Sequence, residues 1–231
     1  MRLGLLRVVP REELPRGVGG QDTLLELNVS GLTRLSASLG LSLAAAVRHH
    51  GLAGGGADTP VGPRRALLAH LAHTLGADAV FAAFARSATS HRGGALLEWR
   101  NAAACAHGRM RPDGYGLLRL GRREYGFFLE FDRGTVRSAA LRAKFAAYHR
   151  YRSSARSARD YDGFPAVLVV TSGPGPEERI VRAVAATGMG FAQELPVLLT
   201  TLSWIGAYPD GPLGPIWRKT GICQRRGWPL S

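Results

Sequence analysis

The sequence predicts an α/β fold built on a mixed sheet, and two observations predict it. Aromatic and branched residues lie on both sides of a turn at Gly121-Arg122-Arg123, which indicates an antiparallel β-hairpin. Further along, a continuous apolar strand over Phe164–Thr171 is followed by a helix and by a second apolar strand over Val197–Leu202. A strand–helix–strand unit of this kind crosses right-handed between parallel strands. The two features together predict a mixed-sheet α/β sandwich.

Composition divides the chain into three expected parts. Residues 52–63, with the sequence LAGGGADTPVGP, have the composition of a linker and indicate a boundary. The parts are therefore an N-terminal segment over residues 1–60, an α/β domain over residues 64–202 and an irregular tail over residues 203–231. The tail contains several glycines, prolines and tryptophans, and we expect Trp217 to pack back onto the domain.

The remaining elements follow from apolar spacing along the chain. In the N-terminal segment, we expect a short strand over Thr23–Val29 and a helix over Gly31–Gly51, which carries leucines at helical spacing. In the domain, repeated i, i+4 apolar pairs predict a helix over Arg64–Ala88, and alternation predicts a strand over Ala95–Asn101. A basic helix over about Val136–Tyr151 follows the hairpin.

Composition also bounds the class of protein. The chain has 231 residues and 45% hydrophobic residues, which is normal for a globular protein. No apolar run is long enough to span a membrane, and the apolar start is too short for a secretory signal. The two cysteines, Cys105 and Cys223, are far apart and form no CxxC motif. We therefore expect a reduced cytoplasmic protein with no membrane partner.

Positive charge is the strongest compositional signal. The formal net charge is +13, and residues 109–159 contain 13 Lys or Arg against 4 Asp or Glu. Such a surplus indicates a polyanionic partner, and we expect DNA, in double-stranded form. The residues expected to contact it are Arg111, Arg122, Arg123, Arg133, Arg137, Arg142, Tyr148 and Arg152.

The predicted register of the hairpin places acidic residues close together. With a turn of two or three residues, Asp113 lies opposite Glu130 or its neighbour, and opposed residues share a face of the sheet. Glu130 and Asp132 are two residues apart on one strand, so they share a face as well. Carboxylates placed in this way suit Mg²⁺, which prefers oxygen ligands, and Asp113, Glu130 and Asp132 are the candidate ligands. The alternative is that these acids are surface groups that offset nearby arginines.

Lys144 is the second chemical candidate. The chain has only two lysines, Lys144 and Lys219, against 28 arginines. Leu141, Phe145 and Tyr148 form a buried helical stripe, and Lys144 falls at its edge. An ammonium at such an edge requires an acidic partner or a phosphate. The alternative is a lysine whose stem covers the helix flank while its ammonium stays in water.

These residues resemble a known family. Pro112-Asp113, the run from Glu130 to Thr135 (EFDRGT), and Lys144 followed by Tyr148 are similar to segments of the replication-relaxation family of bacterial plasmids and mobile elements. The resemblance spans roughly residues 67–201. It implies a winged-helix DNA-binding module followed by a restriction-endonuclease-like domain. The N-terminal segment would then be a small helical remnant of the winged helix.

The resemblance also implies roles for single residues. The wider nuclease superfamily has a PD-(D/E)xK signature, in which the acids hold a divalent metal and the lysine helps to position the attacking water. Carried over, Asp113 and Glu130 are catalytic metal ligands, and Asp78 on the preceding helix is a weaker candidate. The sequence departs from the signature because Asp132 stands where lysine is expected. Lys144 would be the migrated catalytic lysine, and the departure favours a weakly active or inactive core.

Three functions compete at this point. The first is a DNA-binding accessory protein of plasmid or mobile-element replication, with a nuclease-like core that cleaves weakly or not at all. The second is an active Mg²⁺-dependent DNA endonuclease that hydrolyses phosphodiester bonds. The third is a protein-interaction subunit of a replication or transfer complex. A homodimer, or assembly with replication-complex proteins, is compatible with all three.

Overall fold

The structure is a computed structural model of the chain. It describes residues 6–8, 25–27, 29–38, 40, 42–43, 61–154 and 156–229. The chain forms two compact units, residues 1–75 and residues 76–231, and each is described by itself.

The first unit contains a small antiparallel pair of strands. Strand β1 (Leu6–Val8) pairs with β2 (Leu25–Leu27), and helix α1 (Val29–Ser38) follows directly. The strand expected over Thr23–Val29 is therefore present in shortened form. Of the helix expected over Gly31–Gly51, the structure describes α1 up to Ser38, and residues 44–51 lie outside the described residues, as does the linker expected over 52–63 up to residue 60.

Helix α3 (Val61–Thr89) is longer than expected and is continuous through Gly76. A side chain at Gly76 would place its Cβ 2.1 Å from the ring of Phe131, which is far inside van der Waals contact. Glycine is therefore needed here for close packing of the helix on the sheet. Among the described residues, no helix is both long and apolar enough to cross a membrane.

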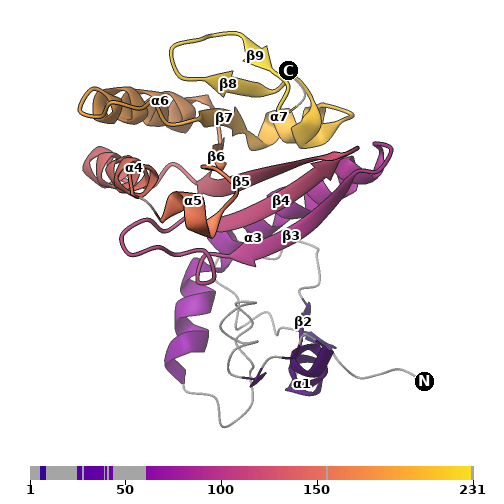
Figure 1. Ribbon diagram of the computed structural model, residues 1–231. Coiled ribbons are helices and arrows are strands. Elements are labelled where there is room, and N and C mark those ends of the chain that lie inside the picture. Colours follow the sequence, from indigo (N-terminus) through magenta and orange to yellow (C-terminus); the bar gives the residue numbers. More distant parts are fainter. Residues whose placement is uncertain are drawn as a thin grey trace. The chain divides into compact units, whose positions relative to one another are not determined.

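The second unit is organised around a mixed sheet whose seven strands lie in sequence order (Figure 1). Strands β5, β6 and β7 are parallel to one another, and the other neighbouring pairs are antiparallel. The mixed α/β class predicted from the sequence is confirmed. The strands are β3 (Ala95–Asn101), β4 (Gly114–Leu120), β5 (Arg123–Asp132), β6 (Ala166–Thr171), β7 (Val197–Thr201), β8 (Trp217–Lys219) and β9 (Arg225–Arg226).

The hairpin has the predicted register. Leu120 pairs with Arg123 across a turn of two residues, and Gly121 takes the positive φ of 63° that this turn requires. At the other end Gly114 pairs with Leu129, and the backbone N–H of Asp113 donates to Leu129 O at 2.9 Å. The next position along each strand therefore sets Asp113 against Glu130.

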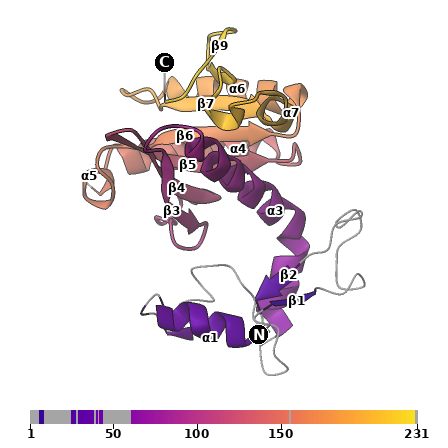
Figure 2. The same ribbon diagram turned by 90° about the vertical axis from the view of Figure 1, so that its right-hand side faces the viewer.

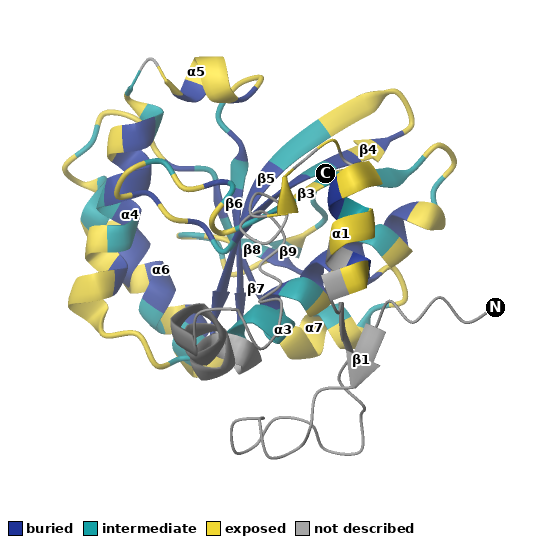
Figure 3. Ribbon diagram, turned by 90° about the horizontal axis from the view of Figure 1, so that it is seen from below, coloured by how far each residue is buried: buried dark blue, intermediate teal, exposed yellow. Residues whose placement is uncertain are grey.

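Helices cover both faces of the sheet (Figure 2). Helices α4 (Ser138–Arg152) and α6 (Pro174–Gly188) pack on one face, and α3 packs on the other. A short helix, α5 (Ser157–Asp160), lies between α4 and β6. Figure 3 shows the result: the central strands are buried, while α4 and α6 carry stripes of buried and exposed residues.

Strand β5 divides its residues between two apolar clusters. Phe127 and Leu129 pack with α3, whereas Phe128 packs with α4 and α6. This alternation follows from the period of two in a strand. It also aims Glu130 and Asp132, which have the same parity as Phe128, at the α4 face.

The segment expected to be an irregular tail is partly regular, which corrects the sequence prediction. It forms helix α7 (Leu202–Ala207), a 3-10 helix η2 (Gly211–Leu213) and strands β8 and β9. Trp217 is buried as expected, and its indole N–H donates to Pro212 O at 2.7 Å. These strands are two and three residues long, so they carry too few residues for an alternating pattern to be visible.

Candidate functional site

Three acidic side chains gather where β4 begins and β5 ends. Glu130 and Asp132 have exposed fractions of only 3% and 7%, which is unusual for carboxylates. Asp113 lies just before β4, and its Oδ2 accepts the backbone N–H of Phe131 at 2.7 Å. The carboxylate of Asp113 therefore bridges the two strands at the end of the hairpin.

Glu130 is held by two side chains from helix α4. Lys144 Nζ donates to Glu130 Oε2, and the hydroxyl of Tyr148 donates to Oε1 at 2.6 Å. The two donors are four residues apart, so they lie on one side of α4 and reach the same carboxylate. The expectation that Lys144 requires an acidic partner is thus met by Glu130.

Burial and neighbouring charges together set the pKa values of Glu130, Lys144 and Tyr148. Burial raises the pKa of Glu130 to about 7, against the opposing effect of the Lys144 ammonium and with a further upward contribution from Asp113. For Lys144, burial alone would lower the pKa, but the charges of Glu130, Asp113 and Asp132 outweigh it and the pKa is raised. Burial, followed by the charge of Glu130 and the hydrogen bond to it, raises the pKa of Tyr148 well above its ordinary value. Lys144 therefore remains an ammonium ion next to Glu130.

Asp132 begins a tight loop between β5 and α4. Its Oδ1 accepts the backbone N–H of Gly134 at 3.1 Å, and Gly134 has a φ of 82°. Arg179 of α6 donates to Gly134 O at 2.6 Å and so ties the loop to a second helix. The other oxygen, Asp132 Oδ2, is buried and has no hydrogen-bond partner among the described residues.

A divalent cation such as Mg²⁺ would require oxygen ligands from this cluster. Both oxygens of Glu130 accept hydrogen bonds from Lys144 and Tyr148, whereas Asp132 Oδ2 is buried and accepts none among the described residues. Within the part of the chain that the structure describes, no three Asp, Glu, His or Cys side chains are grouped closely enough to hold a metal ion. All three predicted ligands, Asp113, Glu130 and Asp132, already accept hydrogen bonds within the chain, and the Mg²⁺ site stays a prediction.

The predicted DNA contacts separate into two groups. Arg133, Arg137 and Arg142 are exposed and follow the acidic cluster on the loop and on the first turns of α4. Arg122 and Arg123 lie at the hairpin turn, which is seven strand residues and roughly 20 Å from the acids. The structure therefore does not bring those two arginines to the site.

The other predicted DNA contacts, Arg111, Arg152 and Tyr148, are not all exposed on the surface. Arg111 is exposed, but Arg152 donates to Glu194 O and stacks over the ring of Phe164. Tyr148 is fully buried, so it supports Glu130 from inside the core and is not a surface contact, which corrects the sequence prediction. The weaker candidate Asp78 lies on α3, which packs on the opposite face from α4; burial raises its pKa to about 6.

Sequence reasoning missed two features near the site. Arg179 gives no signal in the sequence, because it is one arginine among 28 and its contact with Gly134 spans 45 residues. A polar network was also missed: Asp160 accepts the hydroxyl of Tyr151 at 2.7 Å and lies 3.3 Å from His107 Nδ1. His107 Nε2 contacts the hydroxyl of Tyr161 at 3.0 Å. These pairings depend on tertiary folding and leave no local pattern.

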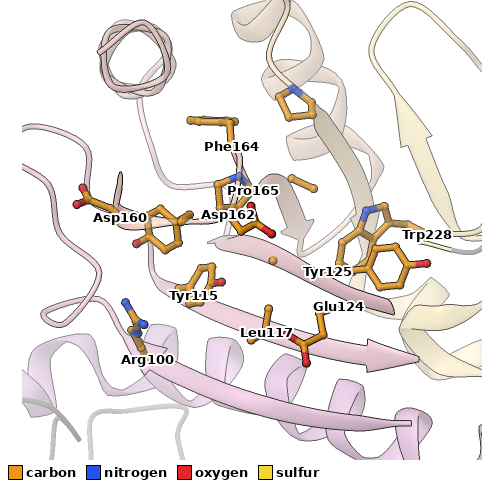
Figure 4. Close-up of a pocket in the computed structure, with 14 residues that line it drawn as sticks. Arg100, Tyr115, Leu117, Glu124, Tyr125, Asp160, Asp162, Phe164, Pro165 and Trp228 are labelled. Atoms are coloured by element: carbon orange, nitrogen blue, oxygen red, sulfur yellow. The ribbon is translucent and has the colours of Figure 1, made fainter. Parts of the chain in front are cut away.

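A separate pocket of about 510 Å³ opens near the hairpin end of β4 and β5 (Figure 4). Its charged side chains are Arg100, Glu124, Asp160 and Asp162, and half of the other lining residues are aromatic, including Trp228. Three carboxylates against one guanidinium give the pocket a negative charge. The pocket is therefore unsuited to a phosphate group. It is also distinct from the acidic cluster, which lies where β4 begins and β5 ends.

Comparison with known proteins gives one match. A family model described as Replication-relaxation matches residues 2–167 of the chain. The matched range contains Asp113, Glu130, Asp132 and Lys144. No curated protein and no solved structure matches the chain.

Proposed function

Because the chain belongs to the replication-relaxation family, we propose that it is a DNA-binding accessory protein of plasmid or mobile-element replication, with a nuclease-like core that cleaves weakly or not at all. The family match points to a role in such replication. DNA binding and the nuclease-like character of the core are the parts that we propose. A cytoplasmic location follows from this role.

The observation that carries DNA binding is the set of exposed arginines beside the acidic cluster. Arg133, Arg137 and Arg142 take part in none of the ion pairs among the described residues. Elsewhere on the same domain Arg218 and Arg225 are neutralised by glutamates of α6. These three arginines, on the loop after β5 and at the start of α4, have no carboxylate partner in those ion pairs. They therefore favour a negatively charged partner, such as double-stranded DNA.

Several features support a restriction-endonuclease-like core. Helix α3 precedes three antiparallel strands, and a parallel strand–helix–strand unit follows. The Pro-Asp pair lies directly before β4, Glu130 lies near the end of β5, and Lys144 reaches Glu130 from the next helix. The β1–β2 pair with α1 supports a winged-helix remnant in the same way. Weak or absent cleavage follows from Glu130, whose two oxygens are already engaged.

Filter binding of double-stranded DNA across a salt series tests this proposal. The wild type should bind, and the logarithm of its affinity should fall linearly with the logarithm of the salt concentration. Substituting Arg133→Gln and Arg137→Gln together should weaken binding and reduce the slope by roughly one to two. Arg86→Gln, on exposed α3 surface, is the matched control and should change neither. An affinity that does not respond to salt would instead favour a protein-interaction subunit.

An active Mg²⁺-dependent endonuclease is the second candidate function. It is favoured by Lys144, which lies within contact of Glu130 as a migrated catalytic lysine would, and by the unpartnered Asp132 Oδ2. Nicking of supercoiled plasmid in the presence of Mg²⁺ or Mn²⁺ tests it, with Asp113→Ala beside the wild type. Metal-dependent nicking that Asp113→Ala abolishes would establish cleavage. Equal nicking by both proteins would indicate a contaminating nuclease.

A further inference from the structure

A hollow of about 330 Å³ lies between helices α4 and α6, which pack side by side on one face of the sheet (Figure 1). Each helix turns one row of side chains toward it, because the lining residues recur at i and i+4 on α4 and at i, i+3, i+4 and i+7 on α6. Small alanines leave the space open, and arginines form much of its wall. The lining consists of Ser138, Arg142, Arg179, Arg182, Ala183 and Ala186.

Three guanidinium groups and no carboxylate line this hollow. Arg142 and Arg182 are exposed, and none of the ion pairs among the described residues involves either of them or Arg179. Like charges brought together without a counter-charge repel one another. An anion in the hollow would remove that repulsion, which makes the hollow suited to an anionic group.

Arg179 provides a second, independent indication. Its Nη2 is fixed by the hydrogen bond to Gly134 O, while its Nε is buried and has no partner among the described residues. The hydrogen bond to Gly134 thus holds the guanidinium of Arg179 in place at the wall of the hollow, without a carboxylate partner among the described ion pairs. Helix α4 adds to the positive potential, because its first turn contains no acidic residue and its N-cap, Arg137, makes no side-chain cap.

The hollow adjoins the acidic cluster through one short loop. Gly134, which Arg179 holds, donates its N–H to Asp132. We propose that the hollow binds one phosphate of the DNA backbone, held jointly by Arg142, Arg179 and Arg182, next to the end of β5. The assignment of that phosphate to DNA rests on the proposed DNA-binding function. The capacity to bind a phosphate group rests on the three arginines alone.

The salt dependence of duplex binding tests the site. Arg142→Gln and Arg182→Gln are made singly and together, and Arg179 is left unchanged because it anchors the loop. Because both arginines serve a single phosphate, the double variant should lower the salt slope by about one, and the effects of the single variants should not add. Arg86→Gln, an exposed arginine on the opposite helical layer, should leave the slope unchanged. A slope that is unaltered in the double variant, or that falls by about two with additive single effects, overturns the proposal.

Isothermal titration with inorganic phosphate separates this inference from the proposed function. The wild type and Arg86→Gln should bind one phosphate per chain at low salt, and the double variant should bind it at least roughly tenfold more weakly. Phosphate binding with this pattern, in a protein that fails to bind duplex DNA at any salt concentration, keeps the phosphate site and refutes DNA binding. Absence of phosphate binding by the wild type, or equal binding by the double variant, overturns the site. Thermal melting of each variant confirms that it is folded.

Discussion

At the scale of single residues, the pairing of Glu130 with Lys144 and Tyr148 is the central feature. A carboxylate with 3% exposure is costly unless its charge is neutralised and its oxygens are hydrogen-bonded. Lys144 does the first and both donors do the second. The sequence indicated that Lys144 requires a partner, because it is one of two lysines and lies at the edge of an apolar stripe. It could not indicate that Tyr148 turns inward to the same carboxylate.

Lys144→Met should destabilise the protein in a pH-dependent manner. Methionine keeps the volume of the stem but leaves Glu130 buried without its counter-charge. The pKa of Glu130, already raised in the folded state, rises further, so stability is retained at low pH and lost as the pH rises through that value. We expect a loss of about 2 kcal/mol at pH 8, below the value for fully buried pairs because Lys144 is 35% exposed, and a smaller loss near pH 5. Urea unfolding at both pH values measures it.

Two variants control this experiment. Lys219→Met removes the only other lysine, whose partner Glu194 is exposed, and should change stability by less than about 0.5 kcal/mol. Adding Glu130→Gln to Lys144→Met should recover part of the loss at pH 8, because the unpaired charge is then gone. A loss that is equal at both pH values would mean that Lys144 acts through packing alone.

At the scale of elements, the contact of α3 with β5 sets the thickness of one layer. Gly76→Ala should destabilise the protein by roughly 1–3 kcal/mol, although alanine is the better helix former by about 1 kcal/mol. The reason is the clash of the new Cβ with the ring of Phe131. Gly206→Ala in α7 has open space around it and should be neutral or slightly stabilising. Thermal unfolding compares the two, and a rise in melting temperature for Gly76→Ala would refute the packing argument.

The elements that sequence reasoning predicted correctly share one property. The hairpin, strand β6 and helix α4 each contain enough residues for their apolar period to be visible in the chain itself. Strands β8 and β9 do not. The pairing of β8 with β7 joins residues about twenty positions apart, and β9 pairs only with β8. Within the site, too, only local pairing could be predicted. The proximity of Asp113 and Glu130 follows from the register of the hairpin, whereas the contact of Arg179 with Gly134 depends on how α6 packs.

At the scale of the whole molecule, the net charge of +13 acts on stability as well as on binding. Self-repulsion of a strongly charged chain destabilises its compact state. Raising NaCl from about 0.01 M to about 0.1 M shortens the screening length from roughly 30 Å to roughly 10 Å, so the melting temperature should rise over this interval and then level off. Differential scanning fluorimetry measures it. A rise that appears only at much higher salt would reflect altered apolar hydration instead.

The alternation along β5 has one further consequence, for folding. If this strand paired one residue out of step with β4 or β6, Glu130 and Asp132 would be driven among the rings of Phe81 and Phe84, where no ammonium could reach them. Misaligned forms of the sheet are therefore penalised by the same two carboxylates that build the site. The same short stretch of chain therefore both fixes the register of the sheet and places the acidic cluster at the end of β5.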